Sequence, residues 1–144
     1  MILSKLWIIL ILTIIFAADI KQMIIPDVCI LLMLPAAIWA GGAWRSRIVA
    51  AALVWGAFLV IAILSALLHN SAPIGMGDIK LFSAIGFISG PAGLTAAAIG
   101  SSLLGGIYAA ALLILKKAQK KDQIPFGPFI AIAYAAYLAS TSAM

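Results

Sequence analysis

The stretch "LFSAIGFISGPAGLTAAAIGSSLLGGIYAAALLIL", residues 81–115, contains 35 residues and no charged side chain. A single α-helix of this length would be about 52 Å long, because each residue adds about 1.5 Å. The hydrocarbon core of a bilayer is only about 30 Å thick. The central "SGPAG" at 89–93 predicts a turn, since Pro91 has no backbone N–H and the flanking glycines permit tight geometry. The stretch therefore predicts two membrane spans joined at this turn.

Four further apolar runs lie on either side of this stretch. They cover residues 2–18, 28–44, 48–68 and 123 to the C terminus. Hydrophobic residues make up 66% of the 144-residue chain and charged residues only 9%, far from the composition of soluble globular domains. We therefore predict an all-α protein, a polytopic membrane helix bundle with about six transmembrane helices that forms a single domain over residues 1–144.

The positive charges are divided unevenly between the two sides that six spans create. One side carries Lys5 and the two arginines of the "WRSR" loop at 44–47, Arg45 and Arg47. The other side carries Lys21, Lys80, Lys116, Lys117, Lys120 and Lys121. Since basic residues accumulate in cytoplasmic loops, the second side is predicted to be cytoplasmic. The net charge of +5 therefore indicates topology in a lipid bilayer, and no nucleic-acid partner is expected.

All acidic residues are aspartates on or near the predicted cytoplasmic side: Asp19, Asp27, Asp78 and Asp122. Asp78 follows Gly77, and Asp27 follows Pro26, at points where an apolar helix is expected to begin. Both therefore fit the role of a helix N-cap. Asp19 instead ends an apolar span, where the helix dipole disfavours an anion. Some other group must hold Asp19 there.

Asp19 and Asp78 would meet at the cytoplasmic boundary if the ends of their helices adjoin. Two carboxyl groups that share a proton cannot both ionise readily. Such a pair is the machinery of an aspartic protease: one carboxylate takes a proton from the attacking water, and the other polarises the peptide carbonyl and protonates the leaving amine. Gly75 and Gly77 have no Cβ, which would let an extended substrate backbone lie beside Asp78.

Three motifs, in this order, resemble those of the type IV prepilin peptidases, which are polytopic aspartic proteases of the GxGD class. "DIKQMIIPD" at 19–27 resembles the first aspartate segment of the family, and "GMGDIKL" at 75–81 resembles the GxGD segment. "IPFGPFIAIA" at 124–133 resembles the C-terminal signature. Together with the predicted spans, the resemblance covers nearly the whole chain.

The resemblance implies that Asp19 and Asp78 are the catalytic pair. Residues implied to bind substrate or support the site are Asp27, Gly75, Gly77, Lys80, Pro125, Gly127 and Pro128. The last three are expected to shape the rim of the active site. Lys80 would either act on Asp78 or extend towards the membrane interface, and we favour the interface.

The family resemblance also implies a substrate and a location. Such enzymes remove short basic leader peptides from precursors of pilins and pilin-like secretion subunits, at the cytoplasmic face of the prokaryotic cytoplasmic membrane. Many bacterial members also methylate the new amino terminus, using an extra N-terminal region that often carries paired CxxC motifs. This chain resembles the short, peptidase-only form found with Tad or Flp pilus systems, so N-methyltransferase activity is not expected. Cys29 is the single cysteine, and we expect no cofactor or metal.

Two functions of other classes stay open. In a small proton- or cation-coupled transporter, Asp19 and Asp78 would bind the ion. That function predicts polar residues at mid-membrane depth, whereas the acids here lie at one interface. An inactive scaffold for pilus assembly is the second alternative. Ala97, Ser101 and Gly105 form a small-residue face that predicts close helix packing, and Trp39 and Trp44 are typical of the aromatic belt at the opposite interface.

Overall fold

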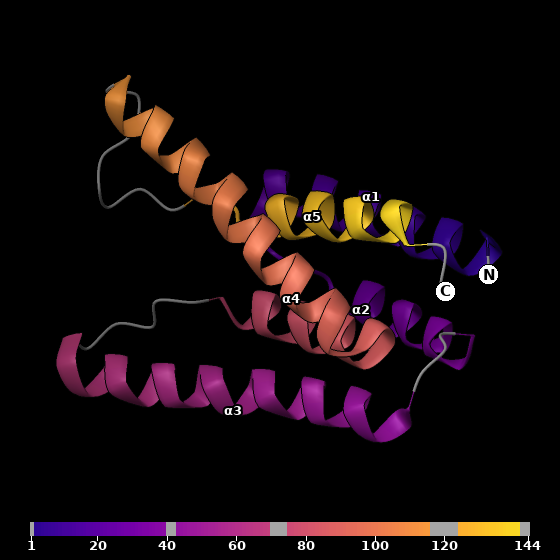
Figure 1. The fold of residues 1–144 in the computed structure, drawn as a ribbon. Coiled ribbons are helices and arrows are strands. Elements are labelled where there is room, and N and C mark those ends of the chain that lie inside the picture. The colour runs from indigo at the N-terminus through magenta and orange to yellow at the C-terminus, as the bar shows by residue number, and fades with distance from the viewer. Residues whose placement is uncertain (1, 40–42, 70–74, 116–123, 142–144) are drawn as a thin grey trace.

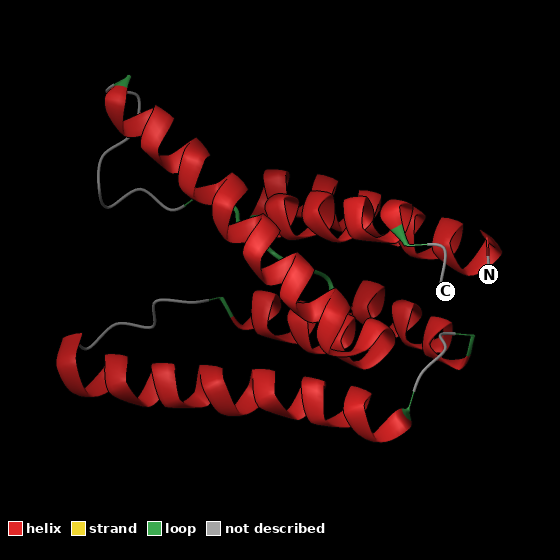
Figure 2. Ribbon diagram, in the orientation of Figure 1, coloured by secondary structure: helices red, strands yellow, loops and turns green. Residues whose placement is uncertain are grey.

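The computed structural model describes residues 2–39, 43–69, 75–115 and 124–141, most of which are helical (Figure 2). In chain order the elements are α1 (Ile2–Gln22), α2 (Asp27–Met33), the 3-10 helix η1 (Leu34–Ile38), α3 (Trp44–His69), α4 (Met76–Ile114) and α5 (Gly127–Ser140). No strand occurs within these described ranges. The all-α prediction is confirmed.

Among the described residues, three helical segments are long and apolar enough to cross a bilayer: Ile2–Gln22, Trp44–Ile61 and Met76–Ile114. Two shorter apolar segments, Asp27–Ile38 and Gly127–Ser140, accompany them. Large apolar side chains on the long helices point outward, as expected where lipid surrounds a protein, and examples are Leu10, Leu59 and Ile107. The chain is therefore a helical membrane protein, but the predicted count of six spans is not confirmed.

The predicted break at "SGPAG" is present as a sharp bend within α4 rather than as a loop. Gly90 has φ 67° and ψ −163°, a conformation that is essentially restricted to glycine. Pro91 follows as the first residue of the next helical segment, where a missing N–H is harmless. Figure 1 shows the two parts of α4 running away from the bend in different directions. We call residues 76–89 arm one and residues 91–114 arm two.

Small residues let both arms pack closely against their neighbours. A Cβ built on Gly86 of arm one would lie 3.3 Å from the backbone of Ala50 on α3. On arm two, a Cβ at Gly105 would lie 2.9 Å from the ring of Phe126, next to the start of α5. The predicted small-residue face is buried at each of its positions, Ala97, Ser101 and Gly105. Its role in helix packing is therefore confirmed.

Charged side chains of α1 face both ends of α5. Lys5 Nζ, near the start of α1, donates to Leu138 O at 2.8 Å and also to Thr141 O. Near the end of α1, Asp19 accepts a hydrogen bond from the Gly127 N–H at 2.9 Å. The two helices are therefore antiparallel. The start of α1, the end of α5, the start of α3 and the bend of α4 gather at one end of the bundle (Figure 1).

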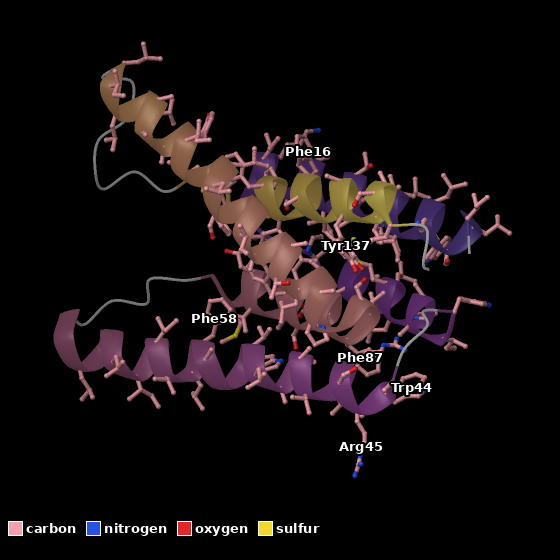
Figure 3. All side chains as sticks on the ribbon, viewed as in Figure 1. Phe16, Trp44, Arg45, Phe58, Phe87 and Tyr137 are labelled. Carbon is pink, nitrogen blue, oxygen red and sulfur yellow. The ribbon has the colours of Figure 1, made fainter. Side chains whose placement is uncertain are left out.

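The structure corrects the expected loop at "WRSR". Residues 44–47 form the first turn of α3. Arg45 is exposed and points away from the bundle, whereas Trp44 turns towards Phe87 of arm one (Figure 3). Arg47 is only 2% exposed. The helix continues through this segment because Arg47 finds buried partners that the sequence alone did not reveal.

Candidate active site

Asp19 lies in the last turn of α1 and is 5% exposed. Its Oδ2 accepts a hydrogen bond of 2.9 Å from the backbone N–H of Gly127, the first residue of α5. The first N–H groups of a helix have no acceptor within the helix and carry a partial positive charge. The N terminus of α5 therefore supplies the partner that an anion at the end of α1 requires.

The contact with Asp19 requires a glycine at position 127. A Cβ there would lie 2.8 Å from Asp19 Oδ2 and 3.0 Å from Asp19 Cγ. Pro128 occupies one of the first positions of α5, where the absence of an N–H leaves no donor unsatisfied. The C-terminal signature predicted to shape the rim thus includes a residue in direct contact with an acidic side chain.

Asp78 is the third residue of α4 and is half-buried. The helix begins after Gly75, which has an extended conformation, and the Asp78 N–H donates to Gly75 O at 3.1 Å. Gly75 is therefore the N-cap, and no side chain caps this helix. The interpretation of Asp78 as an N-cap is wrong, so capping does not account for its carboxyl group.

Both acids line the same two cavities. The larger cavity has a volume of about 1030 Å³, lies between α3 and the two arms of α4, and has Asp19, Asp78 and Pro125 in its wall. The smaller cavity, of about 420 Å³, contains both acids together with Gly75 and residues 23–26. The two carboxyl groups are close enough to interact electrostatically. The structure therefore brings together the pair that the sequence singled out.

The two glycines of the "GMGD" segment have different neighbours. A Cβ on Gly75 would lie 3.3 Å from Asp78 Oδ2, so this glycine leaves room beside the carboxyl group. A Cβ on Gly77 would lie 3.1 Å from Ile25 Cβ, so this glycine lets α4 begin against the segment that follows α1. The space beside the Asp78 carboxyl group thus depends on Gly75, whereas Gly77 serves packing.

Asp27 and Lys80 form an ion pair at the edge of the smaller cavity. Lys80 Nζ lies 2.8 Å from each carboxylate oxygen of Asp27. Asp27 is the first residue of α2 and its N-cap is Pro26, so the interpretation of Asp27 as an N-cap is also wrong. Lys80 pairs with Asp27 instead of extending alone towards the interface. The pair joins α2 to α4 beside the two acids.

The polar side chains that line the two cavities are the carboxyl groups of Asp19 and Asp78, the ion pair of Asp27 and Lys80, and the hydroxyl groups of Thr95 and Ser102. Within the described ranges, no group of three or more His, Cys, Asp or Glu side chains could hold a metal ion. Cys29 is buried in the core and is not among the residues that line the two cavities shared by the acids.

Sequence reasoning missed the amide of Gly127 as the partner of Asp19. A Gly-Pro pair before an apolar run is a signal for the start of a helix. That signal predicts free N–H groups at position 127, but it does not indicate that they meet a side chain 108 positions earlier in the chain. Only the antiparallel packing of α1 and α5 brings the two together.

Comparison with known proteins matches most of the chain. Residues 6–110 match the type IV leader peptidase family. The chain is 35% identical over 125 residues to a protein named prepilin leader peptidase/N-methyltransferase from Bacillus subtilis (strain 168), covering 83% of this chain and 48% of that relative. It is 31% identical over 124 residues to a protein of the same name from Stutzerimonas stutzeri, covering 80% and 42%. The chain thus spans about half the length of these curated relatives, and no solved structure matches it.

Proposed function

The chain belongs to the type IV leader peptidase family, and from this premise we propose that it is a membrane aspartic endopeptidase with Asp19 and Asp78 as its catalytic groups. One observation carries the proposal: two carboxyl groups from separate helices line a common cavity at one end of the bundle. Aspartic proteases require two such groups sharing a proton. Both residues fall inside the part of the chain that matches the family.

The hydrogen bond from Gly127 supports different roles for the two acids. An N–H donor favours the ionised form of a carboxyl group. Burial disfavours the charged form of Asp19, but this donor offsets part of that cost, so we assign Asp19 as the general base that takes a proton from the attacking water. Asp78 carries the shared proton, polarises the peptide carbonyl and protonates the leaving amine. One proton enters the pair at Asp19 from water and one leaves from Asp78 with the amine, and transfer of the shared proton from Asp19 back to Asp78 restores the starting state.

The proposed substrate is the precursor of a pilin or of a pilin-like secretion subunit. The curated relatives are named for a prepilin leader, and we extend that substrate class to this chain. We place the protein in the prokaryotic cytoplasmic membrane with the acids towards the cytoplasm, because they lie on the side richer in lysine. Four of those lysines, in the "KKAQKK" segment at 116–121, lie outside the described residues.

The test is leader removal from a candidate prepilin that is co-expressed with the protein. Wild type, Asp19→Asn and Asp78→Asn are compared, and the pilin mass is measured. Asparagine keeps the size of the side chain but cannot transfer the proton, so each substitution should slow cleavage by about 100- to 10,000-fold. Asp122→Asn removes an acid outside the three motifs that resemble the family and serves as the control.

The result that overturns the catalytic assignment is cleavage by either asparagine variant at the wild-type rate. If the wild type cleaves none of several prepilins while it is present in the membrane, the scaffold or transporter alternative gains support. The same mass spectra report whether a methyl group is added to the processed pilin, which tests the expectation of peptidase activity alone.

A further inference from the structure

Arg47 is enclosed at the end of the bundle opposite the two acids. Its guanidinium donates from Nε to Phe87 O at 2.8 Å and from Nη2 to Ala37 O at 2.6 Å. The guanidinium carbon lies 4.6 Å from the ring centroid of Trp44 and 5.6 Å from that of Phe87. One buried cation thus joins the first turn of α3 to η1 and to arm one.

The bend of α4 explains why Phe87 O needs a donor from elsewhere. In an unbroken helix this carbonyl would accept from the N–H four residues later. That residue is Pro91, which has no N–H. Ala37 lies in the last turn of η1, where carbonyls lose their helical donors as well. Arg47 supplies hydrogen bonds to both helix ends, and its positive charge suits their partial negative charge.

A second contact fixes the bend from the other side. Ser89, the last residue of arm one, shares a hydrogen bond of 2.6 Å between its Oγ and the hydroxyl of Tyr134 on α5. Tyr134 is completely buried. The end of arm one is therefore held by α3 through Arg47 and by α5 through Ser89.

We propose that Arg47 is a positioning residue for the peptidase: by holding the end of arm one at Phe87, it sets the distance of Asp78 from Asp19. Arm one carries Asp78 at its far end, whereas Asp19 is fixed on α5 through Gly127. Nine residues of helix separate Asp78 from Phe87, which corresponds to about 14 Å. A rotation of arm one by about 5° would move Asp78 by about 1 Å, and a misplacement of that size costs about 100-fold in rate.

The first test measures the angle of the bend without any substrate. Spin labels are placed at Met76 on arm one and Ile107 on arm two, both exposed, in a Cys29→Ala background. Arg47→Met removes the donors and the charge, and Arg47→Lys keeps a cation. Arg45→Met removes the same charge from the same turn at an exposed side chain and is the matched control. We expect the label distance to shift or broaden by about 1.5 Å or more in Arg47→Met only, because Met76 lies about 16 Å from Phe87 along arm one and a rotation of about 5° moves it by about that much.

The second test follows cleavage and rests on the proposed function. In unlabelled protein, Arg47→Met should lower kcat about 100-fold with KM within about threefold, because most of the wall of the larger cavity lies outside arm one while Asp78 is displaced. Arg47→Lys should recover at least about tenfold of that loss. Arg45→Met should match the wild type.

The outcomes separate the two claims. Unchanged label distances in Arg47→Met, or an equal loss of kcat in Arg45→Met, overturn the role of Arg47 and leave the peptidase assignment intact. Wild-type protein that cleaves no prepilin overturns the proposed function, while the label distances still decide whether Arg47 sets the bend. If Arg47→Met does not accumulate in the membrane, Arg47→Lys decides: wild-type label distances with lowered kcat contradict the proposal.

Discussion

At one end of the bundle Asp19 faces the N terminus of α5, and at the other end Lys5 faces its C terminus. Helix α5 has 14 residues and is about 20 Å long. Lys5 and Asp19 of α1 are separated by a similar length of helix, and each has the sign that the adjacent helix end favours. The charges of α1 therefore set the register of the pair. We call the two ends the aspartate end and the arginine end.

The two ends differ in what surrounds their charges. At the arginine end, Arg47 is closed in by two carbonyls and two aromatic rings. At the aspartate end, Asp19 has one backbone donor and both acids line open cavities. A charge surrounded by its partners contributes to the architecture, whereas a charge left beside a cavity is available to a substrate. The comparison teaches why similar helix-end contacts serve structure at one end and chemistry at the other.

At the aspartate end, we expect the largest loss of activity from a substitution of Gly127. In Gly127→Ala the new Cβ would lie 2.8 Å from Asp19 Oδ2, so the carboxyl group must move. We expect kcat to fall about 100-fold, because a displacement of about 1 Å is enough for such a loss. Leader cleavage by purified protein, measured over a range of prepilin concentrations, checks the prediction.

Gly106→Ala is the matched control for this substitution. A Cβ at Gly106 has nothing within 4 Å, and the residue lies within arm two, so alanine fits there without a clash. Activity of Gly127→Ala equal to that of Gly106→Ala would show that the contact between Asp19 and α5 is dispensable for catalysis.

At the arginine end, we expect a substitution to lower the stability of the fold and to leave the rate of cleavage largely unchanged. In Lys5→Met the carbonyls of Leu138 and Thr141 lose their cationic donor. We expect the free energy of unfolding to fall by about 1 kcal/mol, the typical size of a favourable charge at a helix C terminus. Unfolding in mixed micelles, followed by tryptophan fluorescence, measures this change, and kcat should stay within about twofold of the wild type.

Lys21→Met is the control, because Lys21 is an exposed lysine in the last turn of the same helix. We expect this substitution to lower the free energy of unfolding by less than about 0.5 kcal/mol. The claimed division between the ends would be wrong if Lys5→Met reduced kcat as strongly as Gly127→Ala while leaving stability unchanged.

The sequence predicted features that depend on local rules. The apolar composition indicated a helical membrane protein, and Pro91 beside Gly90 predicted the break in α4. The places of Asp19 and Asp78 at predicted helix ends, together with the motifs that resemble the prepilin peptidases, pointed to this pair, which lines common cavities. Each of these inferences depends on residues that are close together in the chain or on composition, so no tertiary contact had to be known.

The errors occurred where a distant residue decides the role of a side chain. Asp27 follows a proline and resembles an N-cap, but Lys80 lies 53 positions away and holds it in an ion pair. The "WRSR" segment resembles a polar loop, but Arg47 reaches carbonyls of two other helices. A local sequence pattern does not indicate such partners, because these contacts form only when the helices pack. The number of membrane crossings was not settled by pattern either, since short helices and a bent helix replace regular spans.

The smallest effect is expected for the ion pair between Asp27 and Lys80, which sharpens the comparison because it lies near the aspartate end but joins α2 to α4. Both Nζ–O distances are 2.8 Å, but the side chains are 36% and 64% exposed. Such pairs contribute about 0.2–1 kcal/mol, because solvent screens the attraction.

A double-mutant cycle with Asp27→Asn, Lys80→Met and both together isolates the coupling between the two side chains. We expect a coupling in the free energy of unfolding below about 1 kcal/mol, and cleavage rates within about fivefold of the wild type. A coupling above about 2 kcal/mol would mean that the ion pair is shielded from solvent, as the guanidinium of Arg47 is. The aspartate end would then contain an architectural contact of its own, and openness alone would no longer distinguish it from the arginine end.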